Sequence, residues 1–375
     1  MTAVGDDMDD LGRLVRGQAQ QRAAQGDVAF VRELGVRLAE RNAAAREQVR
    51  ESDRQLALVM RILALTPGRD SLEQLLQLLD DEHTTGAGLP QPFIASLLAE
   101  HQRAADLTAA VLARRDRYRV DELRACLFHE LLIRGVDVDA FQGRDVYAWL
   151  YGRIGPHRFT WLPARRRELE AGAGFPRRRI NGSAFGTATG VPAEGRADPP
   201  TPRTTERSAL RDVATNDVFE AIVAAVREGG WGYCEAWVFR PDEPVAPDRV
   251  PALLPTLPMP CVDGLGPTSR FEVAVRPVDE IWRLLFGVAS MGGMWGKGAH
   301  GAYGRLWAWK SMAGLCGAPE GASAEEVETL ARLTTWFHFE ADAEWFHNDI
   351  DSDFGVAALS SDGRRIAVLA ATDTD

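Results

Sequence analysis

The residues best suited to bind a cation lie near the C-terminal end, in the stretch WFHNDIDSDFG at 345–355. Its alternating acids and the histidine before them are Asp349, Asp351, Asp353 and His347. Carboxylates and imidazole are common metal ligands, so this spacing suggests a cation-binding loop. An EF-hand calcium loop is excluded, because the glycine, counted from Asp349, comes at position 7, one place too late, and Ser360 replaces the closing glutamate.

The same aspartates can instead form the end of a β-hairpin. Asp362 and Gly363 are a two-residue turn signal between the apolar runs FGVAALS and RRIAVLAA. This turn predicts that Leu359 pairs with Ile366, Gly355 with Ala370, Asp353 with Thr372 and Asp351 with Thr374. Both faces of the two runs are apolar, which predicts central strands of a sheet.

The predicted register brings the terminal TDTD to the same end of the hairpin as Asp351 and Asp353. Repulsion among these carboxylates must be offset by arginines or by a divalent cation. Two interpretations stay open. Either Asp351 and Asp353 bind a divalent cation or take part in catalysis, or the acids form a solvated or arginine-paired rim.

A second candidate is the glycine-rich loop MGGMWGKGAHGAYG, which contains GxGxxG at Gly296, Gly298 and Gly301. In a dinucleotide-binding fold such glycines follow a strand, but here a helix is expected before them. A Walker phosphate loop is excluded because glycine follows Lys297. An anion site formed by Lys297, His300 and Arg305 at a helix start remains one interpretation, and a tight turn between helices is the other.

A third candidate is Glu235, on the aromatic face of the predicted strand WGYCEAWVF. A carboxylate buried there could act as a general acid or base, a role that His347 could also fill. The alternative is a solvated or arginine-paired Glu235 at a sheet edge. Zinc-protease chemistry is unsupported, because Ile133 replaces the second histidine of HExxH after His129 and Glu130.

Composition limits the classes of partner and compartment. A net charge of −11 disfavours nucleic acids and anionic membranes as partners. No signal peptide or membrane-spanning run is recognisable, and the four scattered cysteines fit a reducing cytoplasm. We therefore expect a soluble, cytoplasmic, bacterial protein.

The elements that must position these candidates divide the chain. All ten tryptophans lie at or after Trp149. We predict a disordered tail at 1–26, a helical domain at 27–160, a linker or long loop at 171–209 and an α+β domain at 210–375. The helical domain is expected to be a bundle or a short solenoid, with a helix running from about Phe93 to Arg114. The overall fold class is therefore α+β, with a helical N-terminal region and a C-terminal β-hairpin.

The strings AYGRL at 302–306 and LAATDTD at 369–375 resemble an uncharacterised bacterial family, domain of unknown function 6183. The resemblance covers about 216–375, and it implies no activity, cofactor or catalytic residue. The leading hypothesis is a non-enzymatic cytoplasmic interaction or regulatory protein, with a protein partner bound through the helical N-terminal region. The alternative is a small-molecule or metal-dependent enzyme, with its site between loop 292–304 and the acidic hairpin end 349–353/373–375.

Overall fold

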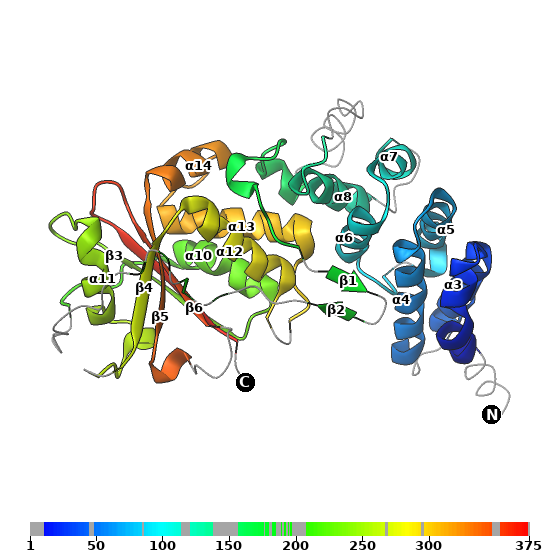
Figure 1. Cartoon of the computed structure of the whole chain (residues 1–375), viewed down its shortest axis with the longest axis horizontal. Coiled ribbons are helices and arrows are strands. Elements are labelled where there is room, and N and C mark those ends of the chain that lie inside the picture. Colours follow the sequence, from blue (N-terminus) through cyan, green and yellow to red (C-terminus); the bar gives the residue numbers. More distant parts are fainter. Residues whose placement is uncertain are drawn as a thin grey trace. The chain divides into compact units, whose positions relative to one another are not determined.

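The computed structural model describes residues 11–44, 49–84, 86–113, 121–137, 157–175, 177–179, 182–184, 189, 191–192, 194, 196, 208–266, 269–293, 296–346 and 353–373. The chain divides into two compact units. Unit 1 comprises 1–157 and 176–185, and unit 2 comprises 158–175 and 186–375. Each unit is described by itself (Figure 1).

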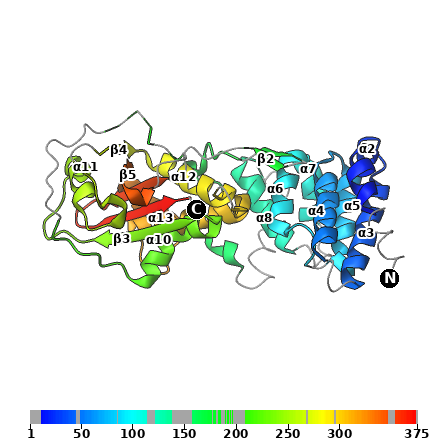
Figure 2. The ribbon, with the colours of Figure 1, turned by 90° about the horizontal axis from the view of Figure 1, so that it is seen from below.

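Unit 1 is mainly helical. Its elements are η1 (Val15–Ala19), α2 (Gln20–Ala24), α3 (Val28–Ala44), α4 (Val49–Leu65), α5 (Arg69–Asp80), η2 (Glu82–Thr84), α6 (Gln91–His101), α7 (Ala104–Leu107), η3 (Thr108–Leu112), α8 (Asp121–Ile133), β1 (Arg177–Arg179) and β2 (Gly182–Ala184). Helix α3 packs against α4 and α5, α4 against α6, and α6 against α8. Figure 2 shows α3, α5, α4, α6 and α8 side by side within this unit.

The structure of unit 1 differs from the expectation at its N-terminal end. Much of the predicted disordered tail is helical, because Leu11, Val15, Ala19 and Ala23 recur every four residues and all are buried. The single helix expected between Phe93 and Arg114 is interrupted after His101. There the side-chain nitrogen of Gln102 donates to the carbonyl oxygens of Ala64, at 3.0 Å, and Thr66, at 2.7 Å, which anchors the break to the end of α4.

Unit 2 combines helices with an antiparallel sheet. Its elements are η6 (Arg158–Trp161), η7 (Glu168–Glu170), α10 (Asn216–Gly229), β3 (Tyr233–Phe239), η8 (Pro247–Arg249), α11 (Val250–Leu253), η9 (Leu254–Thr256), η10 (Pro260–Val262), β4 (Phe271–Arg276), α12 (Val278–Met291), α13 (His300–Cys316), α14 (Ala324–Leu333), β5 (Thr335–Ala341), η11 (Glu344–Phe346), β6 (Phe354–Leu359) and β7 (Ile366–Thr372). The described strands β3 to β7 form one sheet in the order β3-β7-β6-β5-β4. The α+β class is confirmed.

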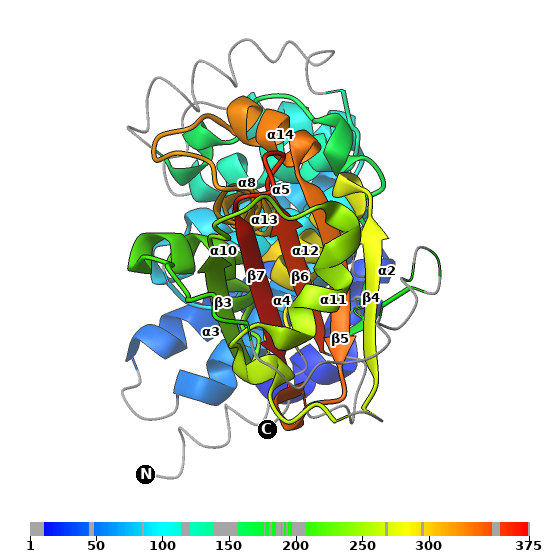
Figure 3. The same cartoon turned by 90° about the vertical axis from the view of Figure 1, so that its left-hand side faces the viewer.

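The sheet of unit 2 lies between two layers. Helices α10, α12 and α13 cover one face, and the segment with η8 to η10 covers the other (Figure 3). On the second face Trp237, Phe239, Phe337 and Val368 pack against residues of the covering segment, such as Leu254. Because β6 and β7 are buried on both faces, their sequences are apolar at every position except the last residue of β7, Thr372, instead of alternating.

The predicted C-terminal hairpin is confirmed in its register. Leu359 pairs with Ile366 and Gly355 with Ala370, and β6 and β7 are inner strands of the sheet. A capping box of Ser323 and Glu326 begins α14. The N-cap of α10 is Thr215, whose hydroxyl accepts from the amide of Val218 at 3.4 Å.

Two segments rich in proline or glycine contain regular structure. The proline-rich excursion at 241–267 contains α11 and three 3₁₀ turns, because prolines at the first helical positions cost no hydrogen bond. Within the predicted linker at 171–209, β1 and β2 pair with each other, and Arg196 forms an isolated bridge with Ala274 at the outer edge of β4.

The four cysteines are free thiols, as expected from their spacing. Among the described residues no helix has both the length and the apolar character needed to cross a bilayer.

Candidate functional site at the acidic end of the sheet

The antiparallel order places five strand ends together. Strands β3, β4 and β6 begin at this end of the sheet, and β5 and β7 finish there. Asp353 and Asp373 are both buried at this end, with 3% and 4% exposure. Glu272 and Glu340, which pair across β4 and β5, add two further carboxylates that the hairpin register alone did not predict. His347 and Asp351 lie outside the described residues.

Asp373 joins the hairpin end to the glycine-rich loop. Its carboxylate accepts a hydrogen bond from the amide of Gly232, at 3.0 Å, in the turn between α10 and β3. On the other side it is packed against Gly293, where an added Cβ would meet the Asp373 carboxylate at 2.4–2.5 Å. The two features that the sequence singled out separately therefore meet, and Asp373 holds three segments of the chain together.

The glycine-rich loop is a turn between two helices, α12 and α13, so no strand precedes it. Gly292 and Gly298 have φ values of 80° and 66°, which favour glycine. A Cβ at Gly296 would meet the carbonyl oxygen of Gly230 at 2.4 Å. The formal GxGxxG pattern thus includes glycines that close backbone packing requires, which accounts for it without a bound nucleotide.

Arg305 binds an anion that belongs to the chain itself. Its guanidinium is fully buried, and it donates from Nε to Glu170 Oε1 at 2.6 Å and from a terminal nitrogen to Glu170 Oε2 at 3.0 Å. The indole of Trp309 donates to the same carboxylate at 2.7 Å. Arg305 is therefore unavailable to an external anion in this conformation. Of the predicted anion cluster, Lys297 remains exposed at the loop, and the partly buried His300 begins α13 with a φ of 61°.

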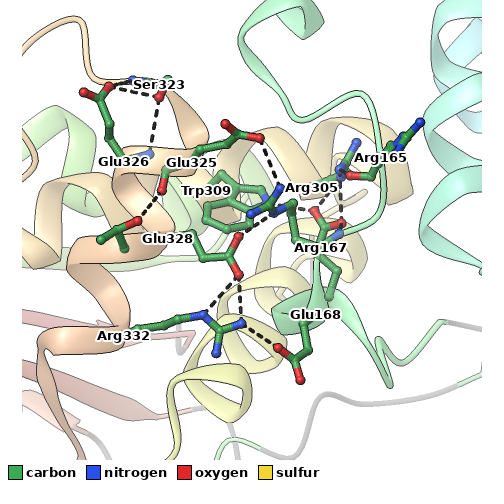
Figure 4. Close-up of polar contacts among 12 residues, drawn as sticks. Arg165, Arg167, Glu168, Arg305, Trp309, Ser323, Glu325, Glu326, Glu328 and Arg332 are labelled. Atoms are coloured by element: carbon green, nitrogen blue, oxygen red, sulfur yellow. Dashed lines mark hydrogen bonds and ion pairs between the residues drawn. The ribbon is translucent and has the colours of Figure 1, made fainter.

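Arg305 and Trp309 lie within a larger set of polar contacts, shown in Figure 4. Arg167 contacts Glu328 and Glu325, and Arg332 contacts Glu328 at 2.8 Å and Glu168 at 3.0 Å. These alternating charges attach the segment at 165–170 to α14. Glu170 was not predicted from the sequence as a functional residue. The only local signal was the run RRRELE, whose charges do not reveal which glutamate is buried.

Glu235 lies on an edge strand, β3, and its side chain is half-buried. The hydroxyl of Tyr233 donates a hydrogen bond to its carboxylate. This bond raises the pKa of Tyr233 to about 12, so the phenol keeps its proton at neutral pH. No arginine, lysine or histidine of the described residues forms an ion pair with Glu235.

Arginines offset the negative charge at the β4 side of this end. Arg270 contacts Glu272 at 2.8 Å and Arg196 contacts it at 2.7 Å. The hydrogen bond from Arg270 is the main reason why the pKa of Glu272 is lowered. Burial instead raises the pKa of the neighbouring Glu340. Among the described residues no group of three metal-ligating side chains could hold a metal ion.

His338 is a buried histidine on β5, two residues before Glu340, and we expect it to make stability depend on pH. Burial lowers its pKa from 6.5 to about 4. The unfolded chain therefore binds a proton between these values that the folded chain does not, so stability is lost as pH falls from 6.5 towards 4. Between pH 7.5 and pH 5 we expect a loss of about 2 kcal/mol from this group alone.

Denaturant unfolding of the His338→Gln variant at both pH values tests this expectation, because the variant should lose about 2 kcal/mol less than the native chain over the same interval. His83→Gln, which changes an exposed histidine of unit 1, serves as the control and should retain the native dependence. Equal pH dependence in all three proteins would show that His338 does not cause it.

One protein-family model matches residues 13–375 and is described as a family of unknown function, DUF6183. The match includes the helical N-terminal half, which the motif resemblance over 216–375 did not. No curated protein and no solved structure matches the chain.

Proposed function

We propose that this chain, which belongs to the family of unknown function DUF6183, is a non-enzymatic interaction or regulatory protein of the bacterial cytoplasm. The observation that carries the proposal is that charged side chains of the kinds that catalyse reactions or bind ligands make internal structural contacts here. Arg305 is neutralised by Glu170, and Asp373 clamps the turn at Gly232 to the loop at Gly293. Such groups stabilise a rigid surface, which is what recognition of a partner needs.

The exposed side chains suggest two different surfaces for a partner. Among the described residues the large exposed apolar side chains lie in unit 2, namely Val213, Tyr233, Val275 and Leu333. We propose that the helical N-terminal region also binds a protein partner, as the leading hypothesis from the sequence has it. Contacts there would be mainly charged, through groups such as the exposed pair Arg16 and Glu51. Unit 2 offers the apolar contacts.

Affinity purification of the tagged full-length protein from its native cell, after brief crosslinking, tests the proposal. We expect one or a few proteins in fixed proportion, and an unchanged metabolite profile when the purified protein is incubated with a cell extract. Reproducible consumption of a metabolite by the purified protein, abolished by a single substitution at the acidic end, would contradict the non-enzymatic function.

The alternative function is a metal-dependent or small-molecule enzyme at the acidic end. The contact between Asp373 and Gly293 favours it, because it brings the hairpin end and the glycine-rich loop into one place. A divalent cation would be the cofactor, with Asp351 and Asp353 as ligands. Thermal unfolding with Ca²⁺, Mg²⁺, Mn²⁺ and Zn²⁺ tests this. Stabilisation that disappears in the Asp351→Asn/Asp353→Asn variant would support the alternative, and equal stabilisation of both proteins would exclude that site.

A further inference from the structure

Tyr233, at the start of β3, and the half-buried Trp345, in η11, form an aromatic corner at the surface of unit 2. Tyr233 is 52% exposed although its neighbours along the strand become buried. Its ring lies 5.6 Å from that of Trp345, and the two planes are inclined at 56°. At this distance the two rings are in contact, and the exposed ring of Tyr233 offers solvent a π-system whose negative quadrupole attracts organic cations.

The corner is held in place from behind. Trp345 packs edge-to-face on Phe346, with 4.9 Å between centroids and 84° between planes, and Phe346 is fully buried. The backbone of Tyr233 pairs with Thr372 on β7, and the hydrogen bond from its hydroxyl to Glu235 positions the ring. Both rings are therefore oriented before any ligand arrives, which lowers the entropic cost of binding.

The carboxylate of Glu235 lies beside the Tyr233 hydroxyl. Glu235 shares a strand face with Tyr233 and accepts the Tyr233 hydroxyl. Three other buried or half-buried glutamates of unit 2 form ion pairs, since Glu170 pairs with Arg305, Glu272 with Arg196 and Arg270, and Glu328 with Arg332. No arginine, lysine or histidine of the described residues forms an ion pair with Glu235, and the exposed acids Asp342 and Glu344 precede Trp345 in the chain.

We propose that Tyr233, Trp345 and Glu235 form a binding site for an organic cation, either an alkylammonium or a guanidinium group. The rings supply the cation–π contacts and the carboxylate supplies the opposite charge, a combination that neither a neutral ligand nor an anion satisfies. The inference rests on the proposed function, because it names the chemistry of what unit 2 binds. The cation belongs either to a free small molecule or to a side chain of a partner protein.

Isothermal titration calorimetry of the full-length protein tests the site with two matched pairs of probes. Choline is compared with its neutral analogue 3,3-dimethylbutanol, and a capped arginine peptide with the same peptide carrying citrulline. We expect at least one cation to bind about tenfold more tightly than its neutral counterpart. Binding of choline alone identifies a small-molecule cation, and binding of the arginine peptide alone identifies a protein side chain.

Three variants distinguish the site from a diffuse negative field. Tyr233→Leu and Glu235→Gln should each weaken cation binding about tenfold. The control Glu344→Gln removes a negative charge from the same neighbourhood, and its affinity for the cation should stay within about twofold of the native value. Tyr233 and Glu344 are exposed, and Glu235→Gln keeps the shape of its side chain, so thermal unfolding should confirm that the variants fold. Cations that bind no more tightly than their neutral counterparts, or an equal loss in Glu344→Gln and Glu235→Gln, would overturn the proposal.

The same variants separate this inference from the proposed function. A partner captured equally well by the native chain and by Tyr233→Leu would support an interaction protein but contradict a docking role for this corner. Tyr233-dependent binding of choline by a chain that also consumes a metabolite would support the cation site and contradict the non-enzymatic function.

Discussion

Replacing Arg305 by leucine is expected to lower the free energy of unfolding by about 3–5 kcal/mol. The substitution leaves Glu170 fully buried and without its ionic partner, with only neutral donors such as the indole of Trp309 to solvate its charge. A buried charge that loses its partner retains the full cost of desolvation. Denaturant unfolding at pH 7.5, followed by tryptophan fluorescence, measures the change.

Two further variants identify the buried charge as the cause. Arg227→Leu removes an exposed arginine paired with Glu220 and should cost less than about 1 kcal/mol. The double variant Arg305→Met/Glu170→Met removes both charges and should be more stable than Arg305→Leu by about 2 kcal/mol or more. If the double variant were less stable than Arg305→Leu, the unpaired charge would not account for the loss.

Replacing Gly355 by alanine is expected to destabilise the chain by about 3 kcal/mol. Gly355 on β6 pairs with Phe339 on β5, and a Cβ at Gly355 would lie 2.3–2.5 Å from carbons of the Phe339 ring. Phe339 is fully buried among Phe271 and Phe346, so its ring has little space to move. The measurement is again denaturant unfolding, compared with the native chain.

A matched pair of variants tests the steric explanation. Gly174→Ala adds the same methyl group where nothing lies within 4 Å, and its effect should stay within about 0.5 kcal/mol. Adding Phe339→Leu to Gly355→Ala should recover part of the loss, because the smaller side chain frees the space that the methyl group needs. Additive effects of the two substitutions would contradict direct contact between these positions.

Local patterns in the sequence predicted much of unit 2. The Asp362-Gly363 turn predicted the register of the hairpin, because side chains alternate along strands and a two-residue turn leaves one pairing. The start of α14 is likewise a local feature, since its capping box involves only Ser323 and Glu326, which are three residues apart. The prediction of a disordered N-terminal tail was wrong where the chain forms a short, alanine-rich helix. The apolar pattern of this helix is weak, and the helix depends on packing against its neighbours.

The partners of charged groups were not predictable from such patterns. Arg305 and Glu170 are 135 residues apart, and Gly232 and Asp373 are 141 apart. The chain contains 54 acidic residues, and nothing in the neighbourhood of Arg305 in the sequence selects Glu170 among them. Burial selects it, because only a carboxylate that is desolvated together with the guanidinium must be paired.

The sequence by itself determined the α+β class, the hairpin and the acidic character of its end, because these follow from contacts between near neighbours along the chain. Only the tertiary structure decided which groups each of the charged side chains contacts. It paired Arg305 with Glu170 and inserted Asp373 between two glycine turns. It also placed Glu235 beside Tyr233, where no arginine, lysine or histidine of the described residues forms an ion pair with it. The physical reason is that electrostatic energies depend on distance and burial in space, and sequence separation constrains neither.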